Sequence, residues 1–472
     1  MELREITGSG TIAPMHPQQL LDACTELVKR TLTFEHPADA VVSRFFRENR
    51  QLGPRERATL AETAYSVLRK KLLFESLARA GSGARERRLA ILGFAESLNA
   101  QSKGESSKPA NKNYGKSANT AAGKPRQTFD TQSFIAAALT LPEQQWLKAC
   151  QEVQPEDLME SQRHNLPQWL AEPLKAQVGD EFWPLAESME ISAPLDLRVN
   201  ALNSKRAEVQ QELAKAGIVA EETPYSPWGL RVHGKPALNQ LNAFIRGALE
   251  VQDEGSQLLA LLLDAKRGEM VVDFCAGAGG KTLAIGATMR NTGRLYAFDV
   301  SGHRLDALKP RLARSGLSNV HPAAIAHERD ERIKRLAGKI DRVLVDAPCS
   351  GLGTLRRNPD LKWRQSPEAV AELTQKQTAI LDSAARLVKA GGRLVYATCS
   401  ILPQENEGIA EAFSAAHPDF ELEDAGAVLE QLKVENAAQL CTGGESGQSY
   451  LRLWPHRHAT DGFFAAVWKR KD

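Results

Sequence analysis

Two cysteines in similar surroundings are the residues of this chain best suited to covalent chemistry. Cys349 lies in Asp-Ala-Pro-Cys-Ser, residues 346–350, and Cys399 lies in Tyr-Ala-Thr-Cys-Ser, residues 396–400. Each follows an apolar run typical of a buried strand and precedes residues that favour a loop. Because open α/β sheets bind ligands at the carboxyl ends of their strands, we expect both thiols at one ligand-binding edge. The alternative is that both are small buried apolar side chains, which is common for free cysteines.

A glycine-rich turn upstream suits a nucleotide-type cofactor. Residues 273–281 read Asp-Phe-Cys-Ala-Gly-Ala-Gly-Gly-Lys, and glycines let the backbone turn sharply and approach a ligand. The helix that follows presents free N–H groups to a carboxylate or phosphate. Asp299 ends the next expected strand, where an acidic side chain accepts hydrogen bonds from ribose hydroxyls. The turn alone would fit NAD equally well, whereas the Walker spacing of an ATP site is absent.

The end of the third expected strand carries His327-Glu328-Arg329-Asp330. An acidic side chain at this point could meet an adenine amino group. Asp330 could equally well cap the N-terminus of a helix. The sequence leaves open whether Asp330 or Glu328 contacts a cofactor.

The order of expected strands and helices around these groups predicts a doubly wound α/β domain. Helix-like segments alternate with most of the expected strands, which favours a mostly parallel sheet. The final run, residues 461–468, is expected to close an antiparallel edge. The expected strands are Met270–Cys275, Arg294–Asp299, Val320–Ile325, Arg342–Asp346, Arg393–Thr398 and Phe463–Trp468.

A small α+β module is expected before this sheet. Strands at Leu195–Asn200, Ile218–Glu222 and Gly229–Val232 and a helix at Ser204–Ala216 follow one another as β-α-β-β. This order is typical of RNA-recognition modules, although the aromatic pair that stacks bases is missing. A packing domain that widens the cleft is the alternative.

The N-terminal part is helical in pattern and basic. Residues 1–127 hold 21 Lys and Arg against 13 Asp and Glu, a net charge of +8, whereas the remainder carries −6. This asymmetry hints at a polyanionic partner. Ser43–Arg47 and Arg69–Lys71 could form a basic surface, or simply the solvated face of a helical bundle.

Five segments follow from these patterns. Residues 101–127 have almost no large apolar groups, which predicts a disordered linker. The expected domains are 1–100 (helical, basic, a possible RNA-binding domain), 101–127 (linker), 128–185 (helical), 186–250 (α+β module) and 251–472 (the α/β sheet domain).

Composition narrows the class of protein further. The chain has 472 residues, of which 42% are hydrophobic and 25% charged. No apolar run reaches the roughly 20 residues of a membrane helix, and the N-terminus lacks the layout of a secretion signal. The six cysteines show no metal-ligand spacing, so neither a zinc site nor a disulfide scaffold is expected. Reduced thiols in the cytoplasm fit best.

Several motifs in one order carry a resemblance to a known family. Together they resemble the bacterial RNA (cytosine-5) methyltransferases of the Sun/Fmu (RsmB/NOP) type, which act on 16S ribosomal RNA and have a Rossmann-like sheet. The resemblance covers about residues 190–472 and is weaker over 1–180, where the family often carries a helical domain related to an antitermination factor. The motifs are Gln252–Gln257, the glycine turn ending in Lys281, Asp346–Gly351, Arg356–Asp360, Lys362-Trp363 and Ala397–Ser400.

The resemblance implies S-adenosylmethionine as cofactor and small-subunit ribosomal RNA as partner. We expect no metal and no membrane partner, and we expect the chain to be a monomer. Asp299 would hold the ribose and Asp330 the adenine. Many members have Ala-Pro-Gly-Gly-Lys at the turn, and the loss of Pro at position 278 should loosen the loop. The residues implied at the cofactor are Cys275, Ala276, Gly277, Ala278, Gly279, Gly280, Lys281, Asp299, Asp330 and Asp346.

The resemblance also implies different roles for the two cysteines. Cys399 attacks C6 of the cytosine, which makes C5 nucleophilic enough to take the methyl group. Cys349 then assists breakdown of the covalent adduct. Asp346, three residues before Cys349, could hydrogen-bond the N4/N3 edge of the base and help to neutralise charge that builds on the ring. A free thiol with a pKa of about 8.5 is only a few per cent ionised at neutral pH, so the site should lower it.

A polar loop after the first cysteine motif offers cations to RNA. Arg356, Arg357 and Lys362 are expected to hold phosphates beside an unpaired or flipped base, although a solvated loop would explain them too. The predicted function is S-adenosylmethionine-dependent methylation of cytosine C5 in ribosomal RNA. The alternatives are a transfer-RNA methyltransferase of the same chemistry and a non-catalytic RNA-binding assembly factor.

Overall fold

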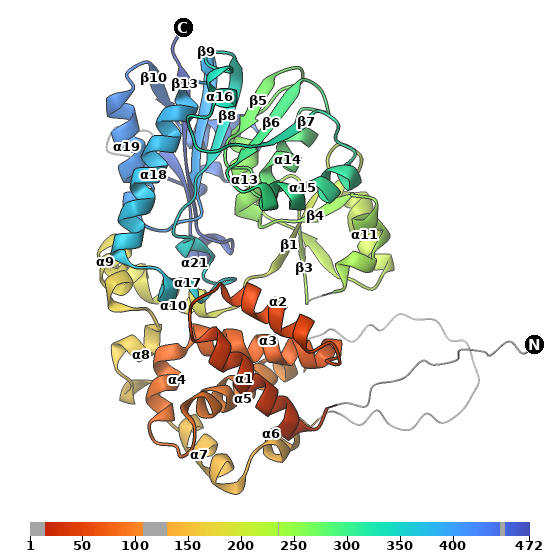
Figure 1. Ribbon diagram of the computed structural model, residues 1–472, viewed down its shortest axis with the longest axis vertical. Helices are drawn as coiled ribbons and strands as arrows, with labels where there is room; N and C mark the ends of the chain where they lie inside the picture. Colours follow the sequence, from red (N-terminus) through yellow and green to blue (C-terminus); the bar gives the residue numbers. More distant parts are fainter. Residues whose placement is uncertain (1–14, 107–129, 235, 444–448) are drawn as a thin grey trace, which may run out of the picture. The chain divides into compact units, whose positions relative to one another are not determined.

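The computed structural model describes residues 15–106, 130–234, 236–443 and 449–472. The chain divides into two compact units (Figure 1). The helical unit consists of Met1–Glu172 and Asn358–Arg364. The sheet unit consists of Pro173–Arg357 and Gln365–Asp472. A short segment late in the sequence is therefore part of the helical unit.

The described part of the helical unit contains a large apolar cluster. In its first helix, Leu20, Leu21, Cys24, Leu27 and Val28 are buried at the three- and four-residue spacing of a helix face. A break at Lys70 separates α3 from α4. The helices are α1 (Pro17–Thr31), α2 (Ala38–Glu48), α3 (Pro54–Arg69), α4 (Lys71–Ala78), α5 (Arg85–Ser106), α6 (Thr131–Ala138), α7 (Leu141–Gln151), α8 (Glu160–His164) and the short α17 (Leu361–Arg364).

The expected linker begins later than predicted. Helix α5 continues through residues 101–106, which the sequence pattern assigns to the linker. Gln, Lys and Glu in this stretch are good helix formers, so the lack of apolar residues alone does not end the helix. The remainder of the expected linker, residues 107–127, lies outside the described residues.

The sheet unit begins within α9, which crosses the boundary at Pro173, and continues with α10 and a small antiparallel sheet. The predicted β-α-β-β order is confirmed, and the structure adds a further strand, β4, that the sequence pattern does not predict. Within the described residues the strand order is β2-β3-β1-β4. The elements are α9 (Gln168–Val178), α10 (Phe182–Glu190), β1 (Leu195–Val199), α11 (Arg206–Lys215), β2 (Ala220–Glu222), β3 (Gly229–Val232), α12 (Asn242–Ile245) and β4 (Leu249–Val251).

The large sheet of this unit has, over the described residues, nine strands in the order β11-β12-β13-β9-β8-β5-β6-β7, with β10 paired to β13. The pairs from β7 to β9 are parallel and the others antiparallel. The strands are β5 (Met270–Asp273), β6 (Arg294–Asp299), β7 (Val320–Ala324), β8 (Ile340–Asp346), β9 (Val388–Thr398), β10 (Phe420–Glu423), β11 (Cys441–Gly443), β12 (Ser449–Leu453) and β13 (Phe463–Arg470).

All six expected strands are present in this sheet. The expectation that the last run closes an edge is wrong, because β13 lies between β9 and β12. Residues 463–468 are all buried. β13 pairs with β9 along Phe464–Lys469 and also with β12 and β10, whereas an edge strand exposes one row of unpaired backbone groups.

Helices cover both faces of the large sheet (Figure 1). Alternate strand residues divide between two apolar clusters, with Val271, Leu344 and Val395 in one and Val272, Val343 and Leu394 in the other. The helices are α13 (Glu254–Leu262), α14 (Gly280–Thr288), α15 (Gly302–Ser315), α16 (Glu331–Lys334), α18 (Pro367–Ala385), α19 (Glu407–Ala416), α20 (Ala425–Gln431) and α21 (Pro455–His458). In the described part of the chain, no helix is long and apolar enough to span a membrane.

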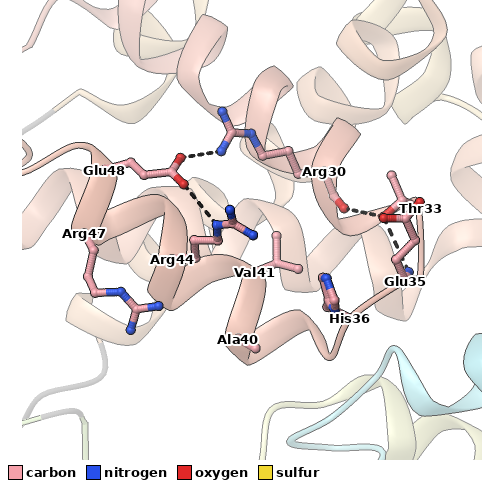
Figure 2. A pocket seen from close by; sticks show the side chains of 9 residues that line it. All are labelled: Arg30, Thr33, Glu35, His36, Ala40, Val41, Arg44, Arg47 and Glu48. Atoms are coloured by element: carbon pink, nitrogen blue, oxygen red, sulfur yellow. Dashed lines mark hydrogen bonds and ion pairs between the residues drawn. The ribbon is translucent and has the colours of Figure 1, made fainter.

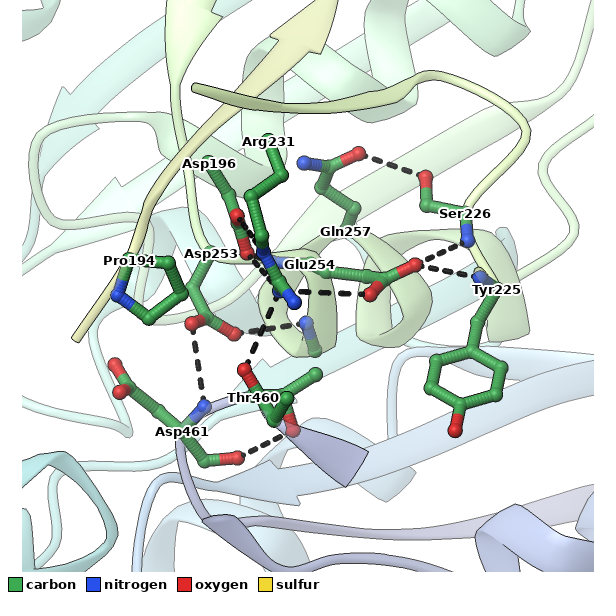
Figure 3. Close-up of polar contacts among 12 residues, drawn as sticks. Pro194, Asp196, Tyr225, Ser226, Arg231, Asp253, Glu254, Gln257, Thr460 and Asp461 are labelled. Carbon is green, nitrogen blue, oxygen red and sulfur yellow. Dashed lines mark hydrogen bonds and ion pairs between the residues drawn. The ribbon is translucent and has the colours of Figure 1, made fainter. Parts of the chain in front are cut away.

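A polar network joins the small sheet to the large one within the sheet unit (Figure 3). Arg231 of β3 donates two hydrogen bonds to Asp196 of β1, at 2.7 and 2.9 Å. Glu254, at the start of α13, accepts from the backbone N–H groups of Tyr225 and Ser226 at 2.6 and 2.7 Å. The Gln252–Gln257 motif therefore fixes the small sheet against the large one.

Candidate active site

The two cysteines of the opening motifs lie in contact. Their Sγ atoms are 3.4 Å apart, because Cys349 follows β8 and Cys399 follows β9, and these strands are parallel neighbours. Both side chains are partly exposed. The predicted meeting of both thiols at one sheet edge is confirmed, and neither residue is fully buried as an apolar core residue would be.

The two thiols are not equivalent. The hydrogen bond with Cys399, together with burial, raises the pKa of the Cys349 thiol well above its ordinary value. The lowered pKa expected for the attacking thiol, which the resemblance assigns to Cys399, stays a prediction. Either sulfur can be the donor in the contact, and the raised pKa of Cys349 favours its thiol form.

An ion pair lies beside the thiols. Lys281 Nζ, on the first turn of α14, contacts Asp346 Oδ2 at the end of β8 at 2.7 Å. Burial alone would lower the pKa of the Lys281 ammonium, yet the Asp346 carboxylate raises it above its ordinary value. The lysine is therefore a fixed positive charge at the carboxyl edge of the sheet.

The glycine turn has the backbone shape that its sequence predicts. Gly277 and Gly279 have φ of 55° and 82°, in the left-handed region that favours glycine. A Cβ at Gly279 would lie 2.1 Å from Leu308 Cδ1, whereas one at Gly277 would meet no atom within 4 Å. Gly279 is thus needed for packing, and Gly277 borders open space.

Asp299 closes this turn against the next strand. Its Oδ2 accepts from the Gly277 N–H at 2.8 Å, and its Oδ1 accepts from the Ser301 N–H at 2.7 Å. Each carboxylate oxygen has a second lone pair. Asp299 therefore shapes the turn and still has acceptor capacity for a ribose hydroxyl.

The polar groups of this edge fit S-adenosylmethionine. Asp273, Asp299 and Asp346 end three strands that are neighbours in the sheet, and carboxylates suit an α-ammonium group and ribose hydroxyls. Asp273 Oδ1 is buried without a hydrogen-bond partner among the described residues, and burial raises the pKa of this carboxyl to about 7. The predicted residues 275–281 form the turn beside them, with Cys275 and Lys281 partly buried and Ala278 exposed.

Asp330 lies further along the edge, where it caps α16. Its two oxygens accept from the backbone N–H groups of Arg332 at 2.9 Å and Ala326 at 3.0 Å. These hydrogen bonds lower the pKa of the Asp330 carboxyl. The helix-cap alternative is thus what the structure shows, and an adenine contact remains a prediction.

The three cations expected at RNA phosphates have internal partners. Arg357 pairs with Asp461 at 2.6 Å and with Asp253 at 2.8 Å. Arg356 is buried and donates to the carbonyl oxygen of Thr460. Lys362, in the helical unit, is buried and donates to the carbonyl oxygen of Arg69 at 2.7 Å. Their phosphate contacts stay a prediction that these internal partners do not favour.

Residues that sequence reasoning missed support the cysteine motifs. Glu405 is fully buried, and it accepts hydrogen bonds from the serine after each cysteine, Ser350 and Ser400. The only signal in the sequence is an acidic residue in Gln404–Glu407, a few positions after the second motif. Nothing in that spacing shows that the carboxylate turns inward to both motifs.

Comparison with known proteins agrees with this geometry. The family model described as 16S rRNA methyltransferase RsmB/F matches residues 260–469. A second family model, that of the ferredoxin-like domain of RsmF/B-like methyltransferases, matches residues 166–239. The described small sheet, β1 to β4, begins within that second match and extends beyond it.

Curated relatives are similar over about two thirds of their own length. A probable ribosomal RNA small subunit methyltransferase B of Synechocystis is 38% identical over 319 residues, 66% of this chain and 68% of the relative. The protein of the same description from Bacillus subtilis is 34% identical, over 65% of this chain and 66% of the relative.

Solved structures share the fold. A crystal structure described as PH0851 has a TM-score of 0.73 and 27% identity over 97% of this chain and 100% of its own. A methyltransferase homolog protein from Pyrococcus horikoshii has a TM-score of 0.57 and 28% identity, covering 67% of this chain and 100% of its own. Taken with the paired cysteines and the glycine turn, these similarities show that the chain belongs to the RsmB/F family of 16S rRNA methyltransferases, whose methyl donor is S-adenosylmethionine.

Proposed function

We propose that this protein methylates C5 of a cytosine in small-subunit ribosomal RNA through a covalent bond between Cys399 and C6. The observation that carries the proposal is the 3.4 Å contact between Cys349 Sγ and Cys399 Sγ, at the sheet edge where Lys281 pairs with Asp346. The names of the relatives, ribosomal RNA small subunit methyltransferase B, support the RNA class.

Cys399 is the nucleophile of the proposed reaction. Its thiolate adds to C6, which moves the C5–C6 π electrons to C5. S-adenosylmethionine, when bound, supplies an electrophilic methyl group to that carbon. A base then takes the C5 proton, the electron pair restores the C5–C6 double bond, and Cys399 leaves as a thiolate.

Cys349 assists departure of the nucleophile. In the proposed reaction its thiol, whose pKa is raised, donates a hydrogen bond to the sulfur of Cys399, which lies 3.4 Å away. A hydrogen bond to the charged form of a group stabilises that form. The Cys399 thiolate is therefore stabilised as it leaves C6, which explains how Cys349 releases the product.

Asp346 and Lys281 serve the base and the cofactor. Asp346 Oδ2 is held by Lys281, and Oδ1 accepts no hydrogen bond from the described residues, so it is available to the amino edge of the cytosine. The fixed ammonium of Lys281 stabilises negative charge that develops on the ring. Residues 275–281 and Asp299 would hold the cofactor beside them.

The helical unit offers a second contact with RNA. A surface pocket of about 410 Å³ is lined by Arg30, His36, Arg44 and Arg47, among others. Figure 2 shows Arg30 and Arg44 on either side of Glu48, with which both form ion pairs. Exposed arginines that keep a hydrogen-bonding face are typical phosphate ligands.

The aromatic residues of α2, Phe45 and Phe46, do not line this pocket. Phe45 is buried beneath Arg30, and the Phe46 ring packs against Arg57. The pocket is therefore proposed to bind the RNA backbone rather than its bases.

The test is transfer of a radiolabelled methyl group from S-adenosylmethionine to 16S ribosomal RNA, with the position read by bisulfite sequencing. We expect one labelled 5-methylcytosine with the wild type and none with Cys399→Ala. Labelling of transfer RNA in place of 16S RNA would favour the transfer-RNA alternative. Binding without any methyl transfer would favour an assembly factor.

A further inference from the structure

Glu405 is a buried carboxylate that no part of the proposed chemistry uses. It ends the 3-10 turn Pro403–Glu405, after the loop that carries Cys399, and its exposed fraction is 0%. No ion pair with Glu405 is formed within the described part of the chain. A buried carboxylate is costly unless hydrogen bonds replace its hydration.

Those hydrogen bonds come from the loops of both cysteines. Glu405 Oε1 accepts from the backbone N–H of Ser350 at 2.8 Å, and Oε2 accepts from Ser350 Oγ at 2.5 Å. Oε2 also accepts from Ser400 Oγ. The two hydroxyl oxygens are themselves 3.2 Å apart. One carboxylate thus binds the residue after Cys349 and the residue after Cys399.

Two further side chains hold Glu405 in place. The side-chain amide Nε2 of Gln377, on α18, donates one hydrogen bond to Glu405 Oε1 at 3.0 Å and one to the carbonyl oxygen of Pro348 at 3.0 Å. The Tyr396 hydroxyl donates to the backbone carbonyl of Glu405 at 2.6 Å. The carboxylate therefore has a fixed position relative to β9 and α18, and the cysteine loops take their positions from it.

We propose that Glu405 is a positioning residue that joins the two cysteine loops and sets the distance between their thiols. The role rests on the proposed function, because it matters to catalysis only if Cys349 acts on Cys399. Removal of the carboxylate leaves Ser350 and Ser400 without their common acceptor, so the two loops are no longer held to one point.

The raised pKa of Cys349 also links Glu405 to the two thiols. The hydrogen bond with Cys399 and burial are the larger causes of its rise, and the Glu405 carboxylate adds to them. Glu405, which joins the two loops, therefore also favours the protonated form of Cys349.

The rate of disulfide cross-linking depends on the distance between the two thiols and does not require methyl transfer. Diamide oxidises the two thiols to a disulfide and is reduced to its hydrazine, taking up both hydrogens. We compare the rate of Cys349–Cys399 disulfide formation, by mass spectrometry of peptides, in the wild type and in Glu405→Ala, Glu405→Gln and Glu411→Ala. Glu411 is exposed on the following helix, so Glu411→Ala is the matched control.

Glu405→Ala should slow cross-linking and lower kcat, each by about 10- to 100-fold, as misplacement of reacting groups does, with KM for RNA unchanged. Glu405→Gln should restore most of both. Its amide oxygen can accept from the Ser350 N–H and from Gln377, and its NH₂ group can donate to the serine hydroxyls, which also accept. Glu411→Ala should behave as the wild type.

Cross-linking or kcat of Glu405→Ala at the wild-type value would overturn the proposal, and so would a rise in KM as the main effect. If Glu405→Ala does not fold, Ser400→Ala removes one of the joined hydroxyls, and it should slow both rates; unchanged rates there count equally against the role. A wild type that cross-links but does not methylate RNA contradicts the proposed function while leaving the cross-linking comparison valid.

Discussion

Cys349 Sγ and Cys399 Sγ lie 3.4 Å apart although the residues are 50 positions apart in the chain. The contact exists because β8 and β9 are parallel neighbours whose carboxyl ends are aligned, with Asp346 opposite Ala397. Two thiols at this distance share one hydrogen bond, so a change in either one alters the other.

Cys349→Ala should accumulate a covalent protein–RNA adduct. The variant retains the Cys399 nucleophile but lacks the hydrogen bond that stabilises the leaving thiolate. Denaturing gel electrophoresis with labelled 16S RNA and S-adenosylmethionine should show a shifted, RNase-sensitive band. Cys399→Ala and the double variant are the controls and should show no band. An adduct that forms only with Cys399→Ala would reverse the two roles.

Alkylation should distinguish the thiols by pH. The thiolate is the species that reacts with iodoacetamide, and the pKa of Cys349 is raised well above its ordinary value. Cys349 should therefore remain mostly unmodified at about pH 7 to 8, and its rate should increase as the pH rises toward the raised pKa. Peptide mass spectrometry after short exposures measures each site. Rapid modification of Cys349 at neutral pH in the folded protein would contradict this prediction.

Substitution of two glycines of the cofactor turn should affect stability and cofactor binding to different degrees. Gly279→Ala places a methyl group 2.1 Å from Leu308 Cδ1, at positive φ, and should destabilise the fold by roughly 2–4 kcal/mol. Gly277→Ala has open space around it, so it should cost only about 1–2 kcal/mol of strain while weakening S-adenosylmethionine binding. Urea unfolding and isothermal titration calorimetry measure the two effects. Equal loss of stability in both variants would contradict the conclusion that Gly279 is needed for packing and that Gly277 borders open space.

Charge reversal in the pocket of the helical unit should change the salt dependence of RNA binding. Arg44→Glu with Arg47→Glu should reduce the slope of log K against log salt by about 0.7–0.9 for each phosphate that the variant no longer neutralises. Filter binding at several salt concentrations measures the slope. Glu411→Ala, at an exposed position of the sheet unit, is the control and should leave the slope unaltered. An unchanged slope in the Arg44/Arg47 variant would contradict the proposal that this pocket binds RNA.

Local sequence determined much of this protein. The apolar runs before Cys349 and Cys399 predict strands, and the glycines at 277 and 279 predict a sharp turn, because these properties depend on neighbouring residues alone. Six strands of the large sheet are predictable for the same reason, since alternation with helical segments is readable along the chain.

Tertiary structure decided which groups meet. Arg356 and Arg357 resemble exposed cations in the sequence, yet Asp253 and Asp461 from distant segments pair with Arg357, and Arg356 is buried. Asp330, expected at the adenine, caps a helix. Glu405 carries no local signal, because its role arises only where the ends of β8 and β9 come together. Side-chain partners across long sequence separations depend on the packing of the sheet, which no local pattern encodes.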